Sequence, residues 1–513
     1  MSRSSEFEKL GRLIAGAEPT EGNGLARRSR RRFLRDSALA LGALTAAGAS
    51  GARNRPAPRI AIIGGGLAGL TCADRLRAKG FAATIYEASN RVGGRCFSLR
   101  GYFPGQIAEL GGEFIDTGHK TMLNYAREFG LLREDVTRGP GETAFYVNGQ
   151  HYSEAEVVAE YRELVPRMRA DLQTLSGSPT FYEHTPADEV LDYTDLATYL
   201  STRAADLPVI RDVLDIAYVA EYGLETSEQS CLNFLLFIHA DRRSKFTPFG
   251  VFSDERYHIR DGNDAIAEHI ADRLPGPIEF DMNLVRLGIN GFGEYEMRFD
   301  NGEVRTSDAV VLAIPFTVLR GVIMEPSLGL SADKLRAINE LGYGNNAKTM
   351  LGFTGRPWLD LHDGNGETLA DLTHVQNTWE TNPADAGVRS ILTDYSGGNR
   401  GRDLANQSLA TRVAEFLGGL ESVYPGISAR YSGLAQRKHW PSHPFSLGSY
   451  TCYKPGQFTT IAGLEGEPAG RLKFAGEHAD SFYSWQGFME GACLSGIRAA
   501  NEVLADIRDG VIP

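Results

Sequence analysis

Cysteine is scarce in this chain of 513 residues, and its five cysteines have no regular spacing. They are odd in number and form no C-x-x-C pair, so no disulfide framework can be read from the sequence. The 11 histidines form no H-E-x-x-H motif and no cluster with cysteine. We therefore predict that the protein has no metal site.

Basic residues are also fewer than acidic residues. The chain has 53 Lys and Arg against 65 Asp and Glu, a formal net charge of −12, which argues against nucleic acid as a partner. Hydrophobic residues make up 42% of the chain and charged residues 23%, a composition typical of a folded globular protein. At about 150 residues per domain, the length allows two to four domains.

The positive charge gathers at the N-terminus. Residues 1–49 contain 9 basic and 5 acidic residues, which leaves 44 basic against 60 acidic residues in the remainder. Residues 29–35 read S-R-R-R-F-L-R, and a small-residue apolar stretch follows at 38–49. We interpret residues 1–49 as a twin-arginine signal peptide that is read by the Tat export machinery, so the mature protein is predicted to be periplasmic or secreted. An apolar stretch of this length falls short of the ~20 residues that span a bilayer.

The sharpest local signal is a glycine motif between a strand pattern and a helix pattern. An apolar run at 59–63 is followed at once by G-G-G-L-A-G, and then by helical periodicity up to about residue 80. In a dinucleotide-binding turn, Gly64 permits the tight turn, Gly66 lets the backbone approach a pyrophosphate, and Gly69 lets helix and strand pack closely. A second strand, 82–86, ends in Glu87, which we expect to accept hydrogen bonds from a ribose.

Two further glycine-rich segments favour FAD over NAD. Residues 90–95 read N-R-V-G-G-R, a second turn in which the Arg95 guanidinium suits a longer pyrophosphate and ribityl chain. Much later, F-A-G-E-H at 474–478, which includes Glu477, and G-F-M-E-G-A at 487–492 precede a helix predicted from about 493 to 504. A strand, a turn and a helix start are what the flavin end of the cofactor would need.

These motifs resemble, in order, those of the flavin-containing amine oxidases, a family that includes monoamine, polyamine, L-amino-acid and bacterial nicotine oxidases. The resemblance runs from about residue 58 to 506. It is carried by R-I-A-I-I-G-G-G-L-A-G-L, E-A-S-N-R-V-G-G-R, A-E-L-G-G-E-F-I, D-A-V-V-L-A-I-P, Y-G-N-N-A-K, F-A-G-E-H and G-F-M-E-G-A-C-L-S-G-I-R-A-A.

The resemblance implies an α/β fold with a Rossmann-like FAD-binding domain and an interleaved α+β substrate domain of sheet plus helices. The FAD-binding domain would comprise residues 58–137, 254–323 and 440–506, and the substrate domain 138–253 and 324–439. Periodicity agrees with this division, since 154–245 reads as helices and 278–312 as strands around Asn-Gly turns. By resemblance, the backbone of Val285 would meet the adenine, and Trp440 would pack near the flavin ring.

The resemblance also implies the chemistry. Such oxidases move a hydride equivalent from the amine-bearing carbon to flavin N5, and the imine then hydrolyses to an aldehyde or keto acid with ammonia. Molecular oxygen is the expected acceptor and hydrogen peroxide the product. Lys348 matches the family lysine that holds a water against N5, and Tyr450 and Phe488 match two rings that flank the amine. Ser449 stands where mammalian monoamine oxidases have a flavin-bound cysteine, so we predict non-covalent FAD.

Substrate identity is less defined. Phe114 stands where venom L-amino-acid oxidases carry a carboxylate-binding arginine, and Asp116 falls where plant polyamine oxidases carry an acid. Asp116 or Thr117 equally suits the N-cap of a helix predicted to end at Glu128. We therefore expect a primary amine, a diamine or a basic amino acid as substrate. A broader L-amino-acid oxidase is the alternative, a desaturase or a non-catalytic flavoprotein is less favoured, and a homodimer is left open.

Overall fold

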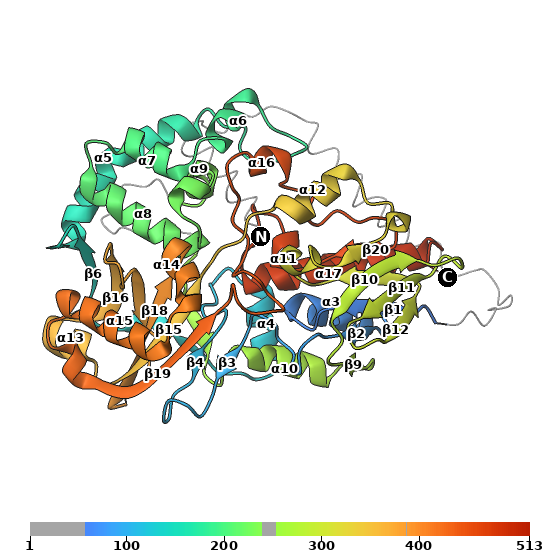
Figure 1. Ribbon diagram of the computed structural model, residues 1–513, viewed down its shortest axis with the longest axis horizontal. Helices are drawn as coiled ribbons and strands as arrows, with labels where there is room; N and C mark the ends of the chain where they lie inside the picture. Colours follow the sequence, from blue (N-terminus) through green and yellow to red (C-terminus); the bar gives the residue numbers. More distant parts are fainter. Residues whose placement is uncertain (1–56, 239–252, 386, 513) are drawn as a thin grey trace, which may run out of the picture.

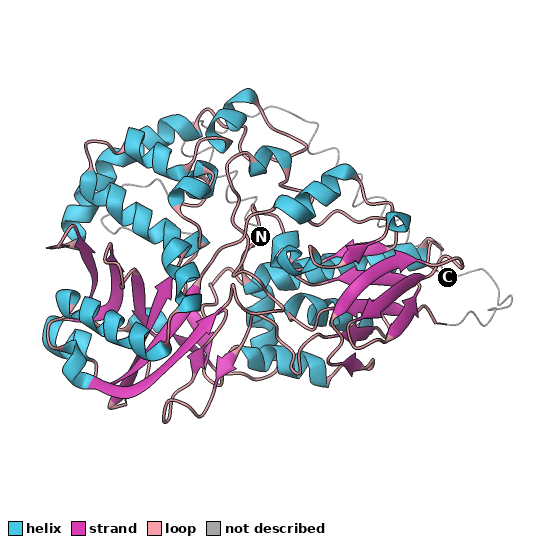
Figure 2. Cartoon of the chain, viewed as in Figure 1, coloured by secondary structure: helices cyan, strands magenta, loops and turns pink. Residues whose placement is uncertain are grey.

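The computed structural model describes residues 57–238, 253–385 and 387–512, so the predicted leader lies outside the described residues. The strands gather in two groups at opposite sides of the molecule, each with its own helices (Figure 2). The predicted α/β class is confirmed. Among the described residues, no helix is long and apolar enough to cross a membrane, and no group of three or more His, Cys, Asp or Glu is placed to hold a metal ion.

The first group is a five-stranded parallel sheet assembled from three distant parts of the chain (Figure 1). Its order is β20 (Leu472–Phe474), β13 (Ala309–Leu312), β1 (Ile60–Ile63), β2 (Thr84–Tyr86) and β9 (Ile278–Glu279). β1 and β13 pair over four residues and are buried throughout, as expected for strands covered on both faces. Beside this sheet lies an antiparallel meander with one added parallel strand, in the order β12 (Val304–Ser307), β11 (Tyr295–Phe299), β10 (Leu284–Ile289) and β14 (Ile323–Met324).

Two helices pack tightly against the parallel sheet and against each other. α3 (Leu67–Arg77) follows the glycine turn, and α17 (Met489–Arg508) is the last helix of the chain. They approach so closely that a Cβ on Gly496 would lie 2.2 Å from the carbonyl oxygen of Ala68. α17 begins four residues before the predicted start at 493, because Gly487, at φ +86°, already completes the preceding turn.

The second group is a seven-stranded sheet whose neighbouring strands are antiparallel except for β16 and β6. Its order is β19 (Tyr431–His439), β15 (Ala347–Thr354), β18 (Arg389–Ser396), β17 (Asn377–Glu380), β16 (Gly364–Ala370), β6 (Glu142–Val147) and β7 (Gln150–Tyr152). A helical layer covers one side, where α8 (Pro208–Tyr222) contacts β6, β16 and β17. α15 (Leu409–Val423) packs Phe416 and Leu420 into a separate apolar cluster with Leu351 of β15.

The other elements complete these layers. They are β3 (Ser98–Leu99) with β4 (Ala108–Glu109), β5 (Arg133–Asp135) with β8 (Tyr257–Ile259), α4 (Lys120–Glu128), α5 (Glu154–Leu172), α6 (Pro186–Asp192), α7 (Leu196–Arg203), α9 (Cys231–Leu235), α10 (Asp264–Asp272), α11 (Phe316–Leu319), α12 (Ala332–Glu340), α13 (Pro357–His362), α14 (Gly398–Asp403) and α16 (Gln457–Thr460).

The predicted N-cap of α4 is wrong. His119, and not Asp116 or Thr117, precedes the first helical residue, and its side chain makes no capping hydrogen bond. The free N–H groups of Thr121 and Met122 instead donate to the Glu490 carboxylate at 2.8–3.0 Å. A carboxylate from α17 therefore caps α4, which no pattern local to the helix encodes.

The close packing at Gly69 yields a stability prediction. A Cβ at this position would lie 2.0 Å from the carbonyl oxygen of Gly64, so Gly69→Ala forces α3 away from the glycine turn. We expect a loss of about 1–3 kcal/mol, measured as a lower melting temperature and weaker retention of cofactor.

The matched control is Gly418→Ala in α15, where nothing lies within 4 Å of the added Cβ. Since Ala is the better helix former, this change should leave the stability unchanged or raise it by up to about 1 kcal/mol. Equal melting temperatures for the two variants would show that the contact at Gly69 does not matter.

Candidate functional site

One large cavity, of about 550 Å³, brings together most of the predicted site residues. Its wall includes parts of both strand groups, from the turn after β1 to strands β15, β17 and β18. Of the predicted residues, those that line it are Gly64, Gly66, Glu87, Arg95, Phe114, Asp116, Lys348, Trp440, Tyr450, Glu477 and Phe488. Gly69 packs behind the turn, and Val285 is not in the wall, where Met282, Asn283 and Leu284 lie instead.

The two glycine-rich turns form a cradle at one end of the cavity. Gly64 has φ +106°, and a Cβ there would lie 2.7 Å from the carbonyl oxygen of Ala313, so only glycine fits. Gly66 and Gly93 pair as an isolated parallel bridge, which sets the two turns side by side. Gly66 precedes α3 without a side-chain cap, so helix N–H groups remain directed toward the cradle.

The carboxylate of Glu87 organises this turn. Its Oε2 accepts a hydrogen bond from the backbone N–H of Gly65 at 2.6 Å, and its Oε1 accepts from the N–H and the hydroxyl of Ser89 at 2.9 and 2.6 Å. A carboxylate oxygen has more than one lone pair, so the predicted bond to a ribose stays compatible with these contacts.

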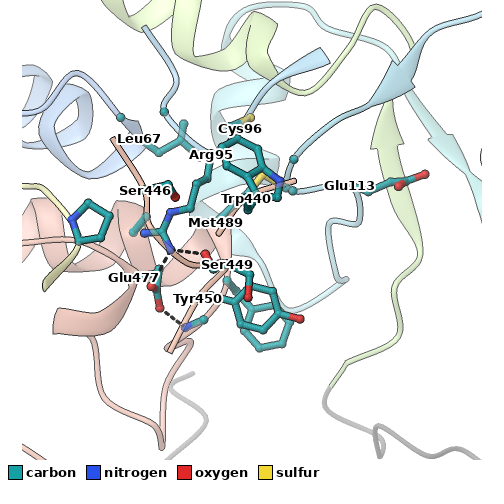
Figure 3. Close-up of a pocket in the computed structure, with 18 of the residues that line it drawn as sticks. Leu67, Arg95, Cys96, Glu113, Trp440, Ser446, Ser449, Tyr450, Glu477 and Met489 are labelled. Atoms are coloured by element: carbon teal, nitrogen blue, oxygen red, sulfur yellow. Dashed lines mark hydrogen bonds and ion pairs between the residues drawn. The ribbon is translucent and has the colours of Figure 1, made fainter. Parts of the chain in front are cut away.

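Arg95 spans the middle of the cavity wall (Figure 3). Its Nη1 donates to Glu477 Oε1 at 2.9 Å and to the backbone oxygen of Ser449 at 2.5 Å. Glu477 Oε2 in turn accepts from Thr451 Oγ1 and from the N–H of Gly487, both at 3.0 Å. This network joins the second glycine turn to the segments that carry Tyr450 and Phe488. Trp440 is buried nearby and donates from Nε1 to the carbonyl of Leu110 at 2.9 Å.

The cradle fits an FAD. Glycines at the two facing turns leave room for a phosphate backbone, a helix N-terminus offers N–H donors, and the same cavity continues past Arg95 to aromatic rings. Gly64, Gly66, Gly94 and Arg95 would hold the pyrophosphate and ribityl parts, and Trp440 would pack near the ring.

Lys348 is buried and has its three ammonium hydrogens directed at protein acceptors. Nζ donates to the carbonyls of Glu109 at 3.0 Å and Gly111 at 2.8 Å, and to Glu113 Oε2 at 2.6 Å. The other oxygen of Glu113 accepts from Trp379 Nε1 at 3.0 Å. The water that the family resemblance implies would have to share one of these hydrogens or displace one of these acceptors.

Tyr450 is fixed by two contacts that the sequence did not reveal. Its hydroxyl lies 2.9 Å from the hydroxyl of Tyr395 and donates to the backbone oxygen of Glu221. Trp379 packs against Tyr395 in a tilted arrangement, with ring centroids 5.3 Å apart. Burial raises the pKa of Tyr450 well above its ordinary value, so its phenol remains protonated and keeps these hydrogen bonds.

Phe488 is held from the other side by aromatic neighbours. Its ring centroid lies 5.5 Å from that of Trp485 and 5.4 Å from that of His119. Gly487 brings the backbone close to Tyr450, since a Cβ there would lie 3.9 Å from the Tyr450 ring. The two predicted rings are thus rigid parts of one wall.

The residues considered for the substrate lie on one segment. The Phe114 ring packs against Trp379 at 5.4 Å. Asp116 is buried, with 1% of its surface exposed, and its Oδ1 accepts from the backbone N–H of Glu255 at 2.8 Å. Asp116 lines the cavity, and through this bond it also holds the backbone of Glu255, another residue of the wall. Glu113, Trp379, Tyr395 and Glu255 are cavity residues that sequence reasoning missed. Of these four, Glu113 stands in the A-E-L-G-G-E-F-I motif at 108–115.

All five cysteines are buried and free. Cys96 is the cysteine that lines the described cavity wall, and burial raises the pKa of its thiol well above the ordinary value. Ser449 is also buried, and its hydroxyl donates to Asn346 Oδ1 at 2.6 Å.

The fold and the cavity define a dinucleotide-binding class of protein whose cavity extends from a glycine cradle to aromatic rings. The sequence model of the flavin-containing amine oxidoreductase family matches residues 67–504. The chain belongs to that family, which implies a flavin cofactor.

YobN of Bacillus subtilis (strain 168), named as a candidate L-amino-acid oxidase, is 28% identical over 472 residues, covering 86% of this chain and 94% of its own. Nicotine dehydrogenase of Pseudomonas putida (strain DSM 28022 / S16) is 24% identical, covering 93% and 97%. A putrescine oxidase solved with putrescine has a TM-score of 0.75 at 18% identity, covering 87% and 99%.

A second prediction concerns the stability that depends on the buried ion pair of Lys348 and Glu113. Lys348→Met leaves a carboxylate buried without its cation, and Glu113→Gln leaves an ammonium without its anion, so each should cost about 3–5 kcal/mol. The double variant should lose clearly less than the sum of the two, measured by denaturant unfolding of the four proteins.

The exposed pair of Arg298 and Glu296, at 2.6 Å, serves as the control. The same cycle there should give a coupling energy of at most about 1 kcal/mol. Additive losses at Lys348 and Glu113 would show that their charges do not depend on each other.

Proposed function

We propose that the protein is an FAD-dependent oxidase that removes a hydride equivalent from the amine-bearing carbon of a small amine. The observation that carries this proposal is the single cavity that joins the glycine cradle to Lys348, Tyr450 and Phe488. Membership of the amine oxidoreductase family supports it. The expected products are an imine, which hydrolyses to a carbonyl compound and ammonia, and hydrogen peroxide from molecular oxygen.

The chain's own residues bind and orient the substrate. When bound, the flavin supplies the electron acceptor for oxidation of the carbon–nitrogen bond. Tyr450 and Phe488 present rings that neighbouring side chains hold in place, so a neutral amine between them has few orientations. Their apolar surfaces exclude water, which keeps the amine neutral and protects the imine until it is released. Lys348 and Glu113 place a fixed pair of opposite charges at the same wall.

An L-amino-acid oxidase is the alternative. It is favoured by the name of the relative YobN, which covers 86% of this chain. Against it stands Phe114, which occupies the position where venom L-amino-acid oxidases carry a carboxylate-binding arginine, and which packs on Trp379. A cavity that recognises a carboxylate needs a cation to pair with it. Of the described cations in the wall, Lys348 is paired with Glu113, Arg95 with Glu477, and Arg91 donates to backbone carbonyls.

The deciding experiment mixes the FAD-loaded protein, without oxygen, with matched panels of monoamines, diamines and L-amino acids. We expect amines to bleach the flavin absorbance, and we expect the Lys348→Met protein to bleach more slowly while its FAD stays bound. Bleaching by neutral L-amino acids alone would establish the alternative. Bound FAD that no panel member bleaches would show a flavoprotein without this catalysis.

Non-covalent binding of FAD is a separate prediction. Ser449 cannot form the thioether that a cysteine forms at this position, and its hydroxyl is engaged with Asn346. Acid precipitation should therefore release the yellow flavin into the supernatant. Flavin that stays in the pellet would contradict the prediction, and a Cys96→Ser variant would then identify or exclude the cysteine in the cavity wall.

A further inference from the structure

Glu113 and Lys348 are two opposite charges enclosed in the cavity wall. Their side chains expose only 2% and 6% of their surfaces, and Glu113 Oε2 accepts from Lys348 Nζ at 2.6 Å. The other two ammonium hydrogens are directed at the backbone carbonyls of Glu109 and Gly111. All three hydrogens of the ammonium group thus have protein acceptors, and one protein carboxylate balances its charge.

The carboxylate of Glu113 is held at both of its oxygens. While Oε2 accepts from Lys348, Oε1 accepts from Trp379 Nε1 at 3.0 Å. Lys348 stands in β15 and Trp379 in β17, on either side of β18 in the seven-stranded sheet. The Trp379 ring packs against Phe114 and Tyr395, with centroids 5.4 and 5.3 Å apart. The carboxylate cannot turn away from the ammonium without breaking its bond to the indole, so the pair stays closed.

The pair lies where the glycine cradle meets the aromatic part of the cavity. Segment 109–113, which accepts all three ammonium hydrogens, is itself bonded to the cradle. The N–H of Gly112 donates to the carbonyl of Arg95 at 3.1 Å, and the carbonyl of Leu110 accepts from Trp440 Nε1 at 2.9 Å. Arg95 and Trp440 are the residues that we expect beside the ribityl chain and the ring of FAD. The two charges therefore belong to the part of the wall where the ring would pack.

We propose that Glu113 sets the electron affinity of the bound cofactor by balancing the charge of Lys348, so that this part of the wall is electrically neutral. Glu113 acts through Lys348 and is a positioning residue. The inference rests on the proposed function, because it needs the FAD that the cradle fits. It also goes beyond that function, since it does not depend on which amine is oxidised.

The physical reason is that reduction changes the charge of the cofactor. Two electrons and one proton add one negative charge, so a positive charge in the wall stabilises the reduced form and a negative charge stabilises the oxidised form. In an enclosed site the effective dielectric is lower than in water, and a single charge acts over several ångströms. A closed pair of opposite charges largely cancels over that distance. The intact protein should therefore differ from any variant that keeps one charge of the pair alone.

The test measures the midpoint potential of the FAD-loaded protein against a dye of known potential, with a chemical reductant and no amine. Glu113→Gln leaves the ammonium alone and should raise the potential, whereas Lys348→Met leaves the carboxylate alone and should lower it. We expect each change to alter the ratio of reduced to oxidised cofactor at least tenfold, which is about 30 mV for a two-electron couple. A general loosening of the site would not move the two variants in opposite directions.

Three further variants define the cause. The double variant of Glu113→Gln and Lys348→Met has neither charge, and its ratio should return to within about threefold of that of the intact protein. Glu113→Asp keeps the charge and should shift the potential less than Glu113→Gln. Glu296→Gln, in the exposed pair with Arg298 on β11 and outside the cavity wall, should leave the potential unchanged. All variants are compared at one pH, and FAD absorbance and the melting temperature confirm that each is folded.

The outcomes separate this inference from the proposed function. Shifts of the two single variants in the same direction, or no shift in either, would refute charge balance while amine oxidation stands. Should a single variant fail to fold, the double variant decides. A double variant with a ratio at least tenfold below that of the intact protein would show that Lys348 acts as an unbalanced charge, and would overturn the inference. A protein that binds FAD and oxidises no amine would contradict the proposed function and leave the potentials measurable.

Discussion

The ammonium group of Lys348 joins the two halves of the molecule at the wall of the cavity. Lys348 belongs to β15 of the seven-stranded sheet, whereas all three of its acceptors belong to residues 109–113, which follow the glycine turns. Because the group is buried, a displacement of either side would strand a charge without a partner. The pair therefore restrains how cradle and chamber face each other, and the positions of Trp379 and the other rings follow from that restraint.

The parts of the fold that could be predicted are those with local causes. The turn at Gly64 is set by close approach and by positive φ, and the helix after it begins where the glycines end. The class of the fold followed from these motifs and their order. The start of α4 could not be predicted, since its cap is Glu490, which is distant in the chain. A local sequence pattern can indicate only hydrogen bonds between neighbouring residues, whereas the bonds from Thr121 and Met122 to Glu490 depend on how α4 packs against α17.

The candidate site shows the same division. Lys348, Tyr450 and Phe488 stand in motifs, and the cavity brings them together. Trp379 and Tyr395 stand in strands that are buried along most of their length, so no alternation in the sequence marks them out, and their part in the wall emerges only when β17 and β18 pair. Glu255 was less visible still, because its place depends on a backbone conformation imposed by Asp116 and by the bridge between Ile115 and Tyr257. Asp116, which follows the A-E-L-G-G-E-F-I motif, holds the backbone of Glu255 in place.

The buried cysteines have a consequence for the lifetime of such an enzyme. The proposed reaction produces hydrogen peroxide in a cavity whose wall includes Cys96. Peroxide oxidises the thiolate far more readily than the thiol, and the raised pKa of Cys96 keeps it in the thiol form at neutral pH. The same burial that packs this side chain beneath the glycine turn would thus protect the protein against the peroxide that the proposed reaction releases at each turnover.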